Sequence, residues 1–203
     1  LAPVIRGRKG EYKKLLEEYI DFLKGLFKGS QPSRYIALAY LTGILPIKRT
    51  MTQSALNNFD EYTMLNPGPL ASFIGFTEGE VKGLSNKYNI DFDRIKKWYD
   101  GYYLNHQHVY NPKAVVSLFT LGVFQSYWAQ TSSYESIHSL IQMNFDGLKE
   151  AVLEMLSGNE VKMQTTSFQN DMVSFKNMDD VLTALVHLGY LGYNQTYKSV
   201  FIP

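Results

Sequence analysis

Seven consecutive apolar residues, 35–41, are followed at once by Thr42-Gly43 and, three residues later, by Pro46. The run is too short for a well-formed helix and is closed by glycine and proline, so it predicts a strand that is buried on both faces. Such strands lie inside parallel sheets that have helices on both sides. No further alternation of helix and strand follows it. We therefore expect this strand to belong to a larger α/β domain, part of which lies outside the chain.

The segment before this run predicts an amphipathic helix over residues 12–27. Gly29 and Pro32 would end the helix, and charged residues fill its opposite face. Its apolar residues recur at spacings of three and four and form one stripe: Tyr12, Leu15, Leu16, Tyr19, Ile20, Leu23, Leu26 and Phe27. We expect the stripe to cover one face of the predicted strand.

The remainder of the chain predicts short helices and hairpins. Thr77 and Glu80 form a capping-box pattern, and Asp100-Gly101 between aromatic flanks predicts the turn of a small hairpin. Asp91 can cap a short helix, and Asn111-Pro112 is typical of a helix start. Residues 131–203 predict three short helices and then a hairpin, which is the outline of a winged-helix domain. The fold class expected is mainly α with minor β.

Composition excludes several classes of protein. The 203 residues are 45% hydrophobic and 19% charged, an ordinary globular balance. The absence of cysteine excludes disulfides and thiolate metal sites within this chain and fits a cytoplasmic protein. No apolar run approaches the ~20 residues that a membrane span needs. Residues 1–50 hold 10 Lys and Arg against 4 Asp and Glu, whereas residues 51–203 hold 10 against 15.

Seven short blocks stand in order along the chain and together resemble a known family. They are LTGILPIK at 41–48, QSALNNF at 53–59, GFTEGEV at 75–81, WYDGY at 98–102, YNP at 110–112, YW at 127–128 and LGYL at 188–191. These blocks resemble the AAA-ATPase-like family of bacterial proteins, which are P-loop ATPase modules often followed by a PD-(D/E)XK nuclease-like domain. The resemblance covers nearly the whole chain and implies ATP and Mg²⁺ as cofactors of the full-length proteins.

The chain departs from that family at its two ends. It contains no G-x-x-x-x-G-K-[ST] phosphate loop. Residues 2–6 resemble the stretch that follows the family's acidic Walker B-like motif, and Pro203 falls about where the nuclease-like domain would begin. We interpret the chain as a fragment, with a natural stand-alone remnant as the alternative. The resemblance implies the end of the ATPase core at 1–76, a lid of helices and a hairpin at 77–130, and a winged-helix-like domain at 131–203.

The candidate nucleotide-proximal residues lie at the end of the predicted strand. The resemblance implies that Thr42 and Gly43 end a P-loop strand, where the γ-phosphate and the attacking water sit. The alternative is that Thr42 satisfies a strand-end amide. Lys48 and Arg49 follow at the same edge and either reach phosphate or are surface charges. No catalytic residue is assigned within this chain, and neither ATP nor Mg²⁺ is expected to bind it alone.

The remaining motif residues predict structure rather than chemistry. Asn57 and Asn58 either bind a ligand or tie down the long loop by side-chain hydrogen bonds, and the second interpretation is favoured. His106 and His108 would share one face of a strand, but a third ligand is missing, so no metal site is predicted. His138 and His187 lie within predicted helices and are expected to be packing or surface residues. Turn formation and packing are expected of Trp98, Tyr99, Asp100, Gly101, Tyr102, Tyr110, Asn111 and Pro112.

Two classes of function follow. In the first, the chain is the lid or regulatory segment of an ATP-driven switch and is inactive alone. In the second, it is a winged-helix module that binds protein or nucleic acid without ATP. Residues 151–203 hold only Lys162, Lys176 and Lys198 against five acids, which disfavours direct DNA binding. The expected partners are the missing ATPase-core segment and a second copy, through residues 1–50.

Overall fold

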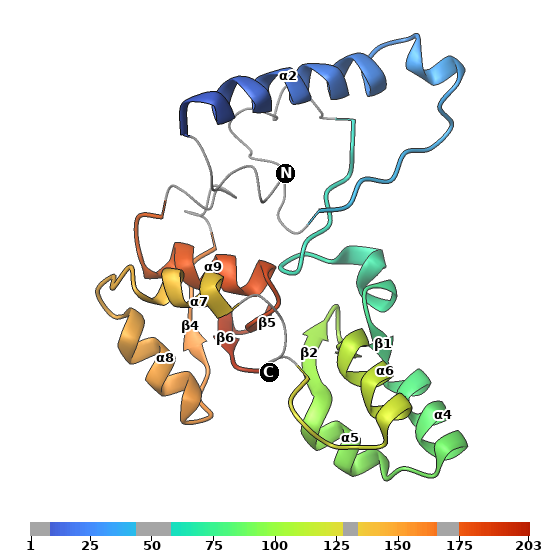
Figure 1. Cartoon of the computed structure of the whole chain (residues 1–203), viewed down its shortest axis with the longest axis vertical. Helices are drawn as coiled ribbons and strands as arrows, with labels where there is room; N and C mark the ends of the chain where they lie inside the picture. The colour runs from blue at the N-terminus through green and yellow to red at the C-terminus, as the bar shows by residue number, and fades with distance from the viewer. Residues whose placement is uncertain (1–8, 44–57, 128–133, 166–174) are drawn as a thin grey trace. The chain divides into compact units, whose positions relative to one another are not determined.

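The computed structural model describes residues 9–43, 58–127, 134–165 and 175–203, which are mainly helical with two small antiparallel sheets (Figure 1). The predicted class, mainly α with minor β, is confirmed at that level. The described residues fall into two compact units, one ending at Glu61 and the other beginning at Tyr62. No helix among the described residues is long and apolar enough to cross a membrane.

The first unit is built on α2 (Lys9–Phe27), which begins three residues before the predicted helix, and on the short 3-10 helix η1 (Pro32–Arg34). Ile20 and Leu23 of the apolar stripe are buried. The end of α2 is fixed by two contacts from the 58–59 segment. Asn58 donates its side-chain amide to the Phe27 carbonyl at 3.1 Å, and the ring of Phe59 packs edge-on against Phe27.

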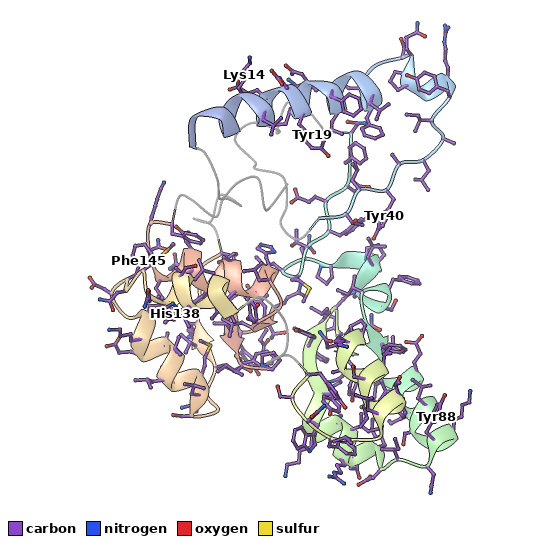
Figure 2. All side chains as sticks on the ribbon, viewed as in Figure 1. Lys14, Tyr19, Tyr40, Tyr88, His138 and Phe145 are labelled. Atoms are coloured by element: carbon purple, nitrogen blue, oxygen red, sulfur yellow. The ribbon has the colours of Figure 1, made fainter. Side chains whose placement is uncertain are left out.

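The predicted buried strand at 35–41 is wrong. Residues 36–43 are irregular, and three of the large apolar side chains in the run are mostly exposed: Tyr35 at 68%, Leu38 at 89% and Tyr40 at 75%. Tyr40 is labelled in Figure 2. A doubly buried strand needs neighbours that bond its amides and layers that cover both faces. None of the described residues of the first unit lies in a strand, so these neighbours are not supplied there.

The second unit begins with a sheet of three strands in the order β1-β3-β2. These are β1 (Phe76–Thr77), β2 (Asp100–Leu104) and β3 (Gln107–Tyr110). The hairpin turns at Asn105 and His106, which both have positive φ, and not at Asp100-Gly101 as predicted. The register shifts between Asp100 and Tyr102, so Asp100-Gly101 forms a bulge inside the strand.

Helices cover one face of this sheet, and a 3-10 helix lies against the other. The helices are α4 (Glu78–Tyr88), α5 (Phe92–Tyr99) and α6 (Pro112–Leu121), capped by Thr77, Asp91 and Asn111 as predicted. Their core contains Val81, Ile95, Tyr110, Val115 and Leu118. The 3-10 helix η2 (Gly68–Phe73) contributes Ala71 to a smaller cluster with Tyr102, Leu104 and Val109.

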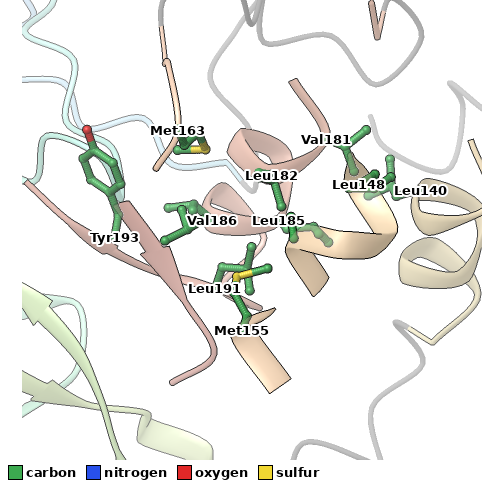
Figure 3. Packing of buried hydrophobic residues seen from close by; sticks show 12 residues of the cluster. Leu140, Leu148, Met155, Met163, Val181, Leu182, Leu185, Val186, Leu191 and Tyr193 are labelled. Carbon is green, nitrogen blue, oxygen red and sulfur yellow. The ribbon is translucent and has the colours of Figure 1, made fainter. Parts of the chain in front are cut away.

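The second unit continues with α7 (Tyr134–Ile141), α8 (Leu148–Leu156), β4 (Val161–Lys162), α9 (Met178–His187), β5 (Gly192–Asn194) and β6 (Ser199–Phe201). The predicted three helices followed by a hairpin are confirmed. The sheet order is β4-β6-β5. The largest core cluster surrounds α9: Leu140 and Leu148 lie beside Val181, and Met155 lies beside Leu191 (Figure 3). The winged-helix assignment and the division at 76/77 and 130/131 stay predictions.

Candidate functional site

Three of the sequence blocks meet on one sheet of the second unit. Phe76, in the block at 75–81, is paired with Tyr110, in the block at 110–112. Asp100, in the block at 98–102, is paired with Tyr110 from the other side. The blocks therefore mark neighbouring strands, although Phe76 and Tyr110 are 34 residues apart in the sequence.

Two glycines of these blocks stand where the chain approaches other atoms closely. A Cβ on Gly75 would lie 2.6 Å from the Tyr110 carbonyl oxygen and 2.6 Å from a methyl of Val109. A Cβ on Gly101 would lie 2.7 Å from the Pro203 ring. Since both separations are well below van der Waals contact, these positions admit only glycine without a shift of the backbone.

Tyr102 ties the sheet to the end of α9. Its side chain is buried, and its hydroxyl donates to the carbonyl of Gly189 in the block at 188–191. Burial raises the pKa of Tyr102 to about 12, and a hydrogen bond from the Asn111 side chain acts in the opposite direction. Asn111 in turn accepts from the Ala114 amide and caps α6. A chain of hydrogen bonds thus connects three blocks.

The acceptor of this bond is oriented by the end of α9. Gly189 has a φ of 80°, and the Tyr190 amide donates back to the Leu185 carbonyl at 2.8 Å. This left-handed glycine turn ends the helix and directs the Gly189 carbonyl outward. In a second hydrogen bond, the Gln195 side-chain amide donates to the Leu65 carbonyl at 2.7 Å. We call the region held by these bonds the joint.

A pocket of about 220 Å³ lies at the joint, and we call it the joint pocket. Its polar lining comes from Tyr102, Asn111, His187 and the Gly189 backbone. Burial lowers the pKa of His187 to about 4, so its imidazole is neutral at pH 7. The rest of the lining consists of Met64, Ile74, Leu104, Val109, Tyr110, Pro112 and Leu188. Among the described residues, no Asp, Glu, Lys or Arg lines it, which makes it a poor place for phosphate.

A charged cluster lies on the same sheet. Asp100 contacts His108 at 2.8 Å and Lys96 at 3.9 Å, and Lys96 reaches Glu78 at 3.0 Å. The hydrogen bond from Lys96 lowers the pKa of Glu78, and the same bond raises the pKa of Lys96. These pairs join α4, α5 and the hairpin. Each carboxylate of the cluster lies beside a cation. This arrangement is typical of a structural ion-pair network and not of a catalytic pair of carboxylates.

The aromatic motif residues pack as a scaffold. Tyr99 is buried, stacks on Phe124 and exchanges hydrogen bonds with the backbone of Gln125. Trp98 is 47% exposed and lies against the same two rings. Tyr110 is fully buried, and its hydroxyl has no hydrogen-bond partner among the described residues. Burial raises the pKa of Tyr110. Pro112 occupies the first position of α6.

The nucleotide-proximal candidates are not brought together with these groups. Thr42 and Gly43 are exposed on the irregular segment of the first unit. Lys48, Arg49 and Asn57 lie outside the described residues. Asn58 donates a side-chain hydrogen bond to the Phe27 carbonyl, and this is the structural role that the sequence analysis favoured. The role of Thr42 therefore stays a prediction.

No group of three or more His, Asp or Glu able to hold a metal occurs in the part of the chain that the structure describes. His106 lies in the hairpin turn rather than on a strand beside His108, so the predicted sharing of one strand face is wrong. Asparagine and histidine at the turn adopt the left-handed conformation, which separates the two imidazoles into turn and strand.

Sequence reasoning missed the joint pocket. His187 was expected to be a packing or surface residue, and Met64 carried no signal at all. The available signal was the order His187-Leu188-Gly189, in which a titratable group stands at the last position of α9, two residues before a glycine. Its partners Tyr102 and Asn111 come from a distant part of the chain, so only the tertiary structure reveals the pocket.

No protein-family model matches the chain, and no solved structure matches it. A protein of Azotobacter chroococcum mcd 1, described as an uncharacterized protein in the region 5′ to vnfD, is 28% identical over 123 residues. The match covers 59% of this chain and 23% of that protein. The chain is therefore similar to less than a quarter of a much longer protein.

Proposed function

We propose that the chain is a lid or regulatory segment of an ATP-driven switch, whose nucleotide is held mainly by other parts of the protein. The observation that carries the proposal is the exposed apolar run at 35–41, which ends at Thr42-Gly43. Exposed apolar runs of this kind normally mark an interaction site. The neighbouring strands of a P-loop sheet would bury the run and would place Thr42 at a strand end, near the phosphates.

The joint supports the same proposal, because it is built to hold elements together. Tyr102, Asn111 and Gly189 connect the β2–β3 hairpin to the end of α9 through backbone and side-chain hydrogen bonds. No charged side chain from the described part of the chain lines its pocket, so the joint would transmit movement of a lid rather than bind phosphate. In this proposal Lys48 and Arg49 approach the nucleotide, and other parts of the protein hold Mg²⁺.

Calorimetric titration with MgATP tests the proposal on two forms of the protein. We expect no saturable binding by the 203-residue chain, and binding by a longer protein that carries a phosphate loop. In that longer protein Thr42→Ala should lower the rate of ATP hydrolysis, whereas Thr120→Ala on α6 should not. Micromolar, magnesium-dependent binding of ATP to the 203-residue chain would refute the proposal that other parts of the protein hold the nucleotide.

A winged-helix interaction module is the second candidate function. The order β4-β6-β5, with α9 directly before the β5–β6 hairpin, favours it. However, every residue of α9 from Asp180 to Val186 is buried, so little of this helix is free to enter a DNA groove. The basic residues Lys162, Lys176 and Lys198 are few. A protein partner therefore fits this module better than DNA does.

A further inference from the structure

We propose that the turn after α6 docks on an anionic membrane surface, where Leu121 and Val123 enter the interface and Arg94 and Lys97 lie among the lipid phosphates. The inference goes beyond the proposed function, because it requires neither ATP nor any residue of the first unit. The chain would lie on the membrane surface, since no helix among the described residues is able to cross a bilayer.

Exposed apolar side chains gather where the end of α6 meets α5. We call Trp98, Leu121, Val123 and Phe124 the apolar patch. Leu121 is 60% exposed, Val123 is 52% exposed and Trp98 is 47% exposed. The ring centres of Trp98 and Phe124 are 6.2 Å apart, so Trp98 lies beside the turn. Exposed apolar side chains that occur singly are ordinary, whereas a group of them marks an interaction site.

The backbone of the turn is bonded within the protein. Gly122, with a φ of 69°, ends α6 in the left-handed conformation. The Val123 carbonyl accepts from the hydroxyl of the buried Tyr127 at 2.6 Å. The Gln125 carbonyl accepts from the Tyr99 hydroxyl at 3.0 Å, and the Gln125 amide donates to the same hydroxyl oxygen. Backbone groups that are bonded internally need less water, so the turn can present its apolar side chains to a lipid interface.

Two cations border the apolar patch. The Arg94 guanidinium lies over the Phe124 ring, 4.1 Å from its centre. Lys97 is exposed on the same helix. Lys96 takes part in the charged cluster, but no ion pair of Arg94 or Lys97 occurs in the described part of the chain. Asp93 precedes Lys97 by one helical turn and offsets part of its charge. The border of the patch is therefore positive, which favours an anionic partner.

The combination of apolar, aromatic and basic side chains matches a membrane interface. Binding of such surfaces increases with apolar area and with attraction to anionic lipids. Indole rings favour the headgroup level, and Trp98 lies beside a turn whose Leu121 and Val123 are more exposed. A single strand of nucleic acid would need a longer track of cations than Arg94 and Lys97 provide. A protein partner is the other occupant, and vesicle binding distinguishes the two.

Cosedimentation with lipid vesicles tests the inference. The 203-residue chain is mixed with vesicles of phosphatidylcholine alone, or of phosphatidylcholine with about 30% phosphatidylserine. We expect binding to the anionic vesicles to be about tenfold tighter, because each basic side chain near an anionic surface adds about fivefold and Asp93 removes part of this gain. The difference should disappear in roughly 0.5 M salt, which screens exposed charges.

A fluorescent label reports whether the turn itself enters the interface. The chain has no cysteine, so Val123→Cys can carry one environment-sensitive fluorophore at a single position. Its emission should shift to shorter wavelength when anionic vesicles are added. The same label on Leu156→Cys, at a position of α8 that is 67% exposed, should keep its emission.

Variants of the apolar side chains locate the contact. Leu121→Ser combined with Val123→Ser should weaken vesicle binding at least about tenfold, because two apolar side chains no longer leave water. The matched control is Leu153→Ser combined with Leu156→Ser, at two exposed positions of α8, which should leave binding unchanged. All four side chains are exposed, so both variants should fold, and circular dichroism checks this.

A variant of the charge tests the preference for anionic lipid. Lys97→Gln should lower the ratio of the two vesicle affinities by about fivefold, whereas Lys149→Gln, at an exposed position of α8, should not.

Four results would overturn the inference. The first is no cosedimentation with anionic vesicles at millimolar lipid, which is expected if a protein covers the apolar patch. The second is equal affinity for the two kinds of vesicle, and the third is an unshifted label at position 123. The fourth is binding that survives Leu121→Ser with Val123→Ser, which would place the contact elsewhere, for example at the exposed run 35–41.

Discussion

Tyr102 and His187 line the same pocket, and burial shifts their pKa values in opposite directions. The pKa of Tyr102 is raised to about 12, and that of His187 is lowered to about 4. Both shifts favour the neutral form of the side chain, because a charge is poorly solvated in an apolar pocket. The joint is therefore uncharged at neutral pH, and its strength depends on hydrogen bonds.

Replacing Tyr102 by Phe should destabilise the chain by about 1–2 kcal/mol, because the Gly189 carbonyl loses its donor. Urea unfolding followed by circular dichroism measures the change. Tyr103→Phe is the matched control: Tyr103 is the next residue on β2 and is 43% exposed, so we expect a change within about 0.5 kcal/mol. Equal effects of the two substitutions would mean that the Tyr102–Gly189 bond adds no stability.

His187 should make the stability of the chain fall below about pH 6.5. Its pKa is lowered from 6.5 in the unfolded chain to about 4 in the folded one, so between these values the unfolded state binds more protons. The free energy of unfolding should therefore be highest above pH 6.5 and should fall by up to roughly 3 kcal/mol as the pH approaches 4. Urea midpoints at pH 7, 6 and 5 measure this slope. His187→Gln should flatten the slope, and an unchanged slope would contradict the assignment.

Elements whose signals are local were predicted well from the sequence. The caps Thr77, Asp91 and Asn111 were correct because each pattern acts within one helical turn. The strand at 35–41 was predicted wrongly because its formation depends on neighbours that no local pattern specifies. The bulge at Asp100-Gly101 was read as a turn because both use the same residues. The joint pocket could not be predicted, since its lining joins Tyr102 to residues more than 80 positions away.

Gly75→Ala should destabilise the hairpin sheet by about 1–3 kcal/mol, because the new methyl group would lie 2.6 Å from the backbone oxygen of Tyr110. Gly83→Ala is the matched control. Gly83 lies inside α4, where an added Cβ meets nothing within 4 Å, so alanine should stabilise the helix by up to about 1 kcal/mol. Thermal unfolding of both variants measures the change: the unfolding temperature should fall for Gly75→Ala and rise for Gly83→Ala. A stable Gly75→Ala protein would show that β1 can move away from β3.

For the whole molecule, the exposed run at 35–41 predicts self-association of the 203-residue chain. Leu38 is 89% exposed within an apolar segment, and such segments pair readily with other copies. Leu38→Lys should weaken a dimer in sedimentation velocity, whereas Leu153→Lys, at an exposed apolar position of α8, should not. Circular dichroism checks the folding of both variants. A parent chain that stays monomeric at high micromolar concentration would contradict the prediction.

The Tyr102–Gly189 bond also bears on the order in which the second unit folds. It closes a separation of 87 residues, whereas the β2–β3 and β5–β6 hairpins each close only a few. Closing a short loop costs less chain entropy than closing a long one. The two hairpins can therefore form before the Tyr102–Gly189 hydrogen bond does. The joint would then be absent from the rate-limiting step of folding and would act mainly by slowing unfolding. Its contribution is to the lifetime of the native state rather than to the speed of reaching it.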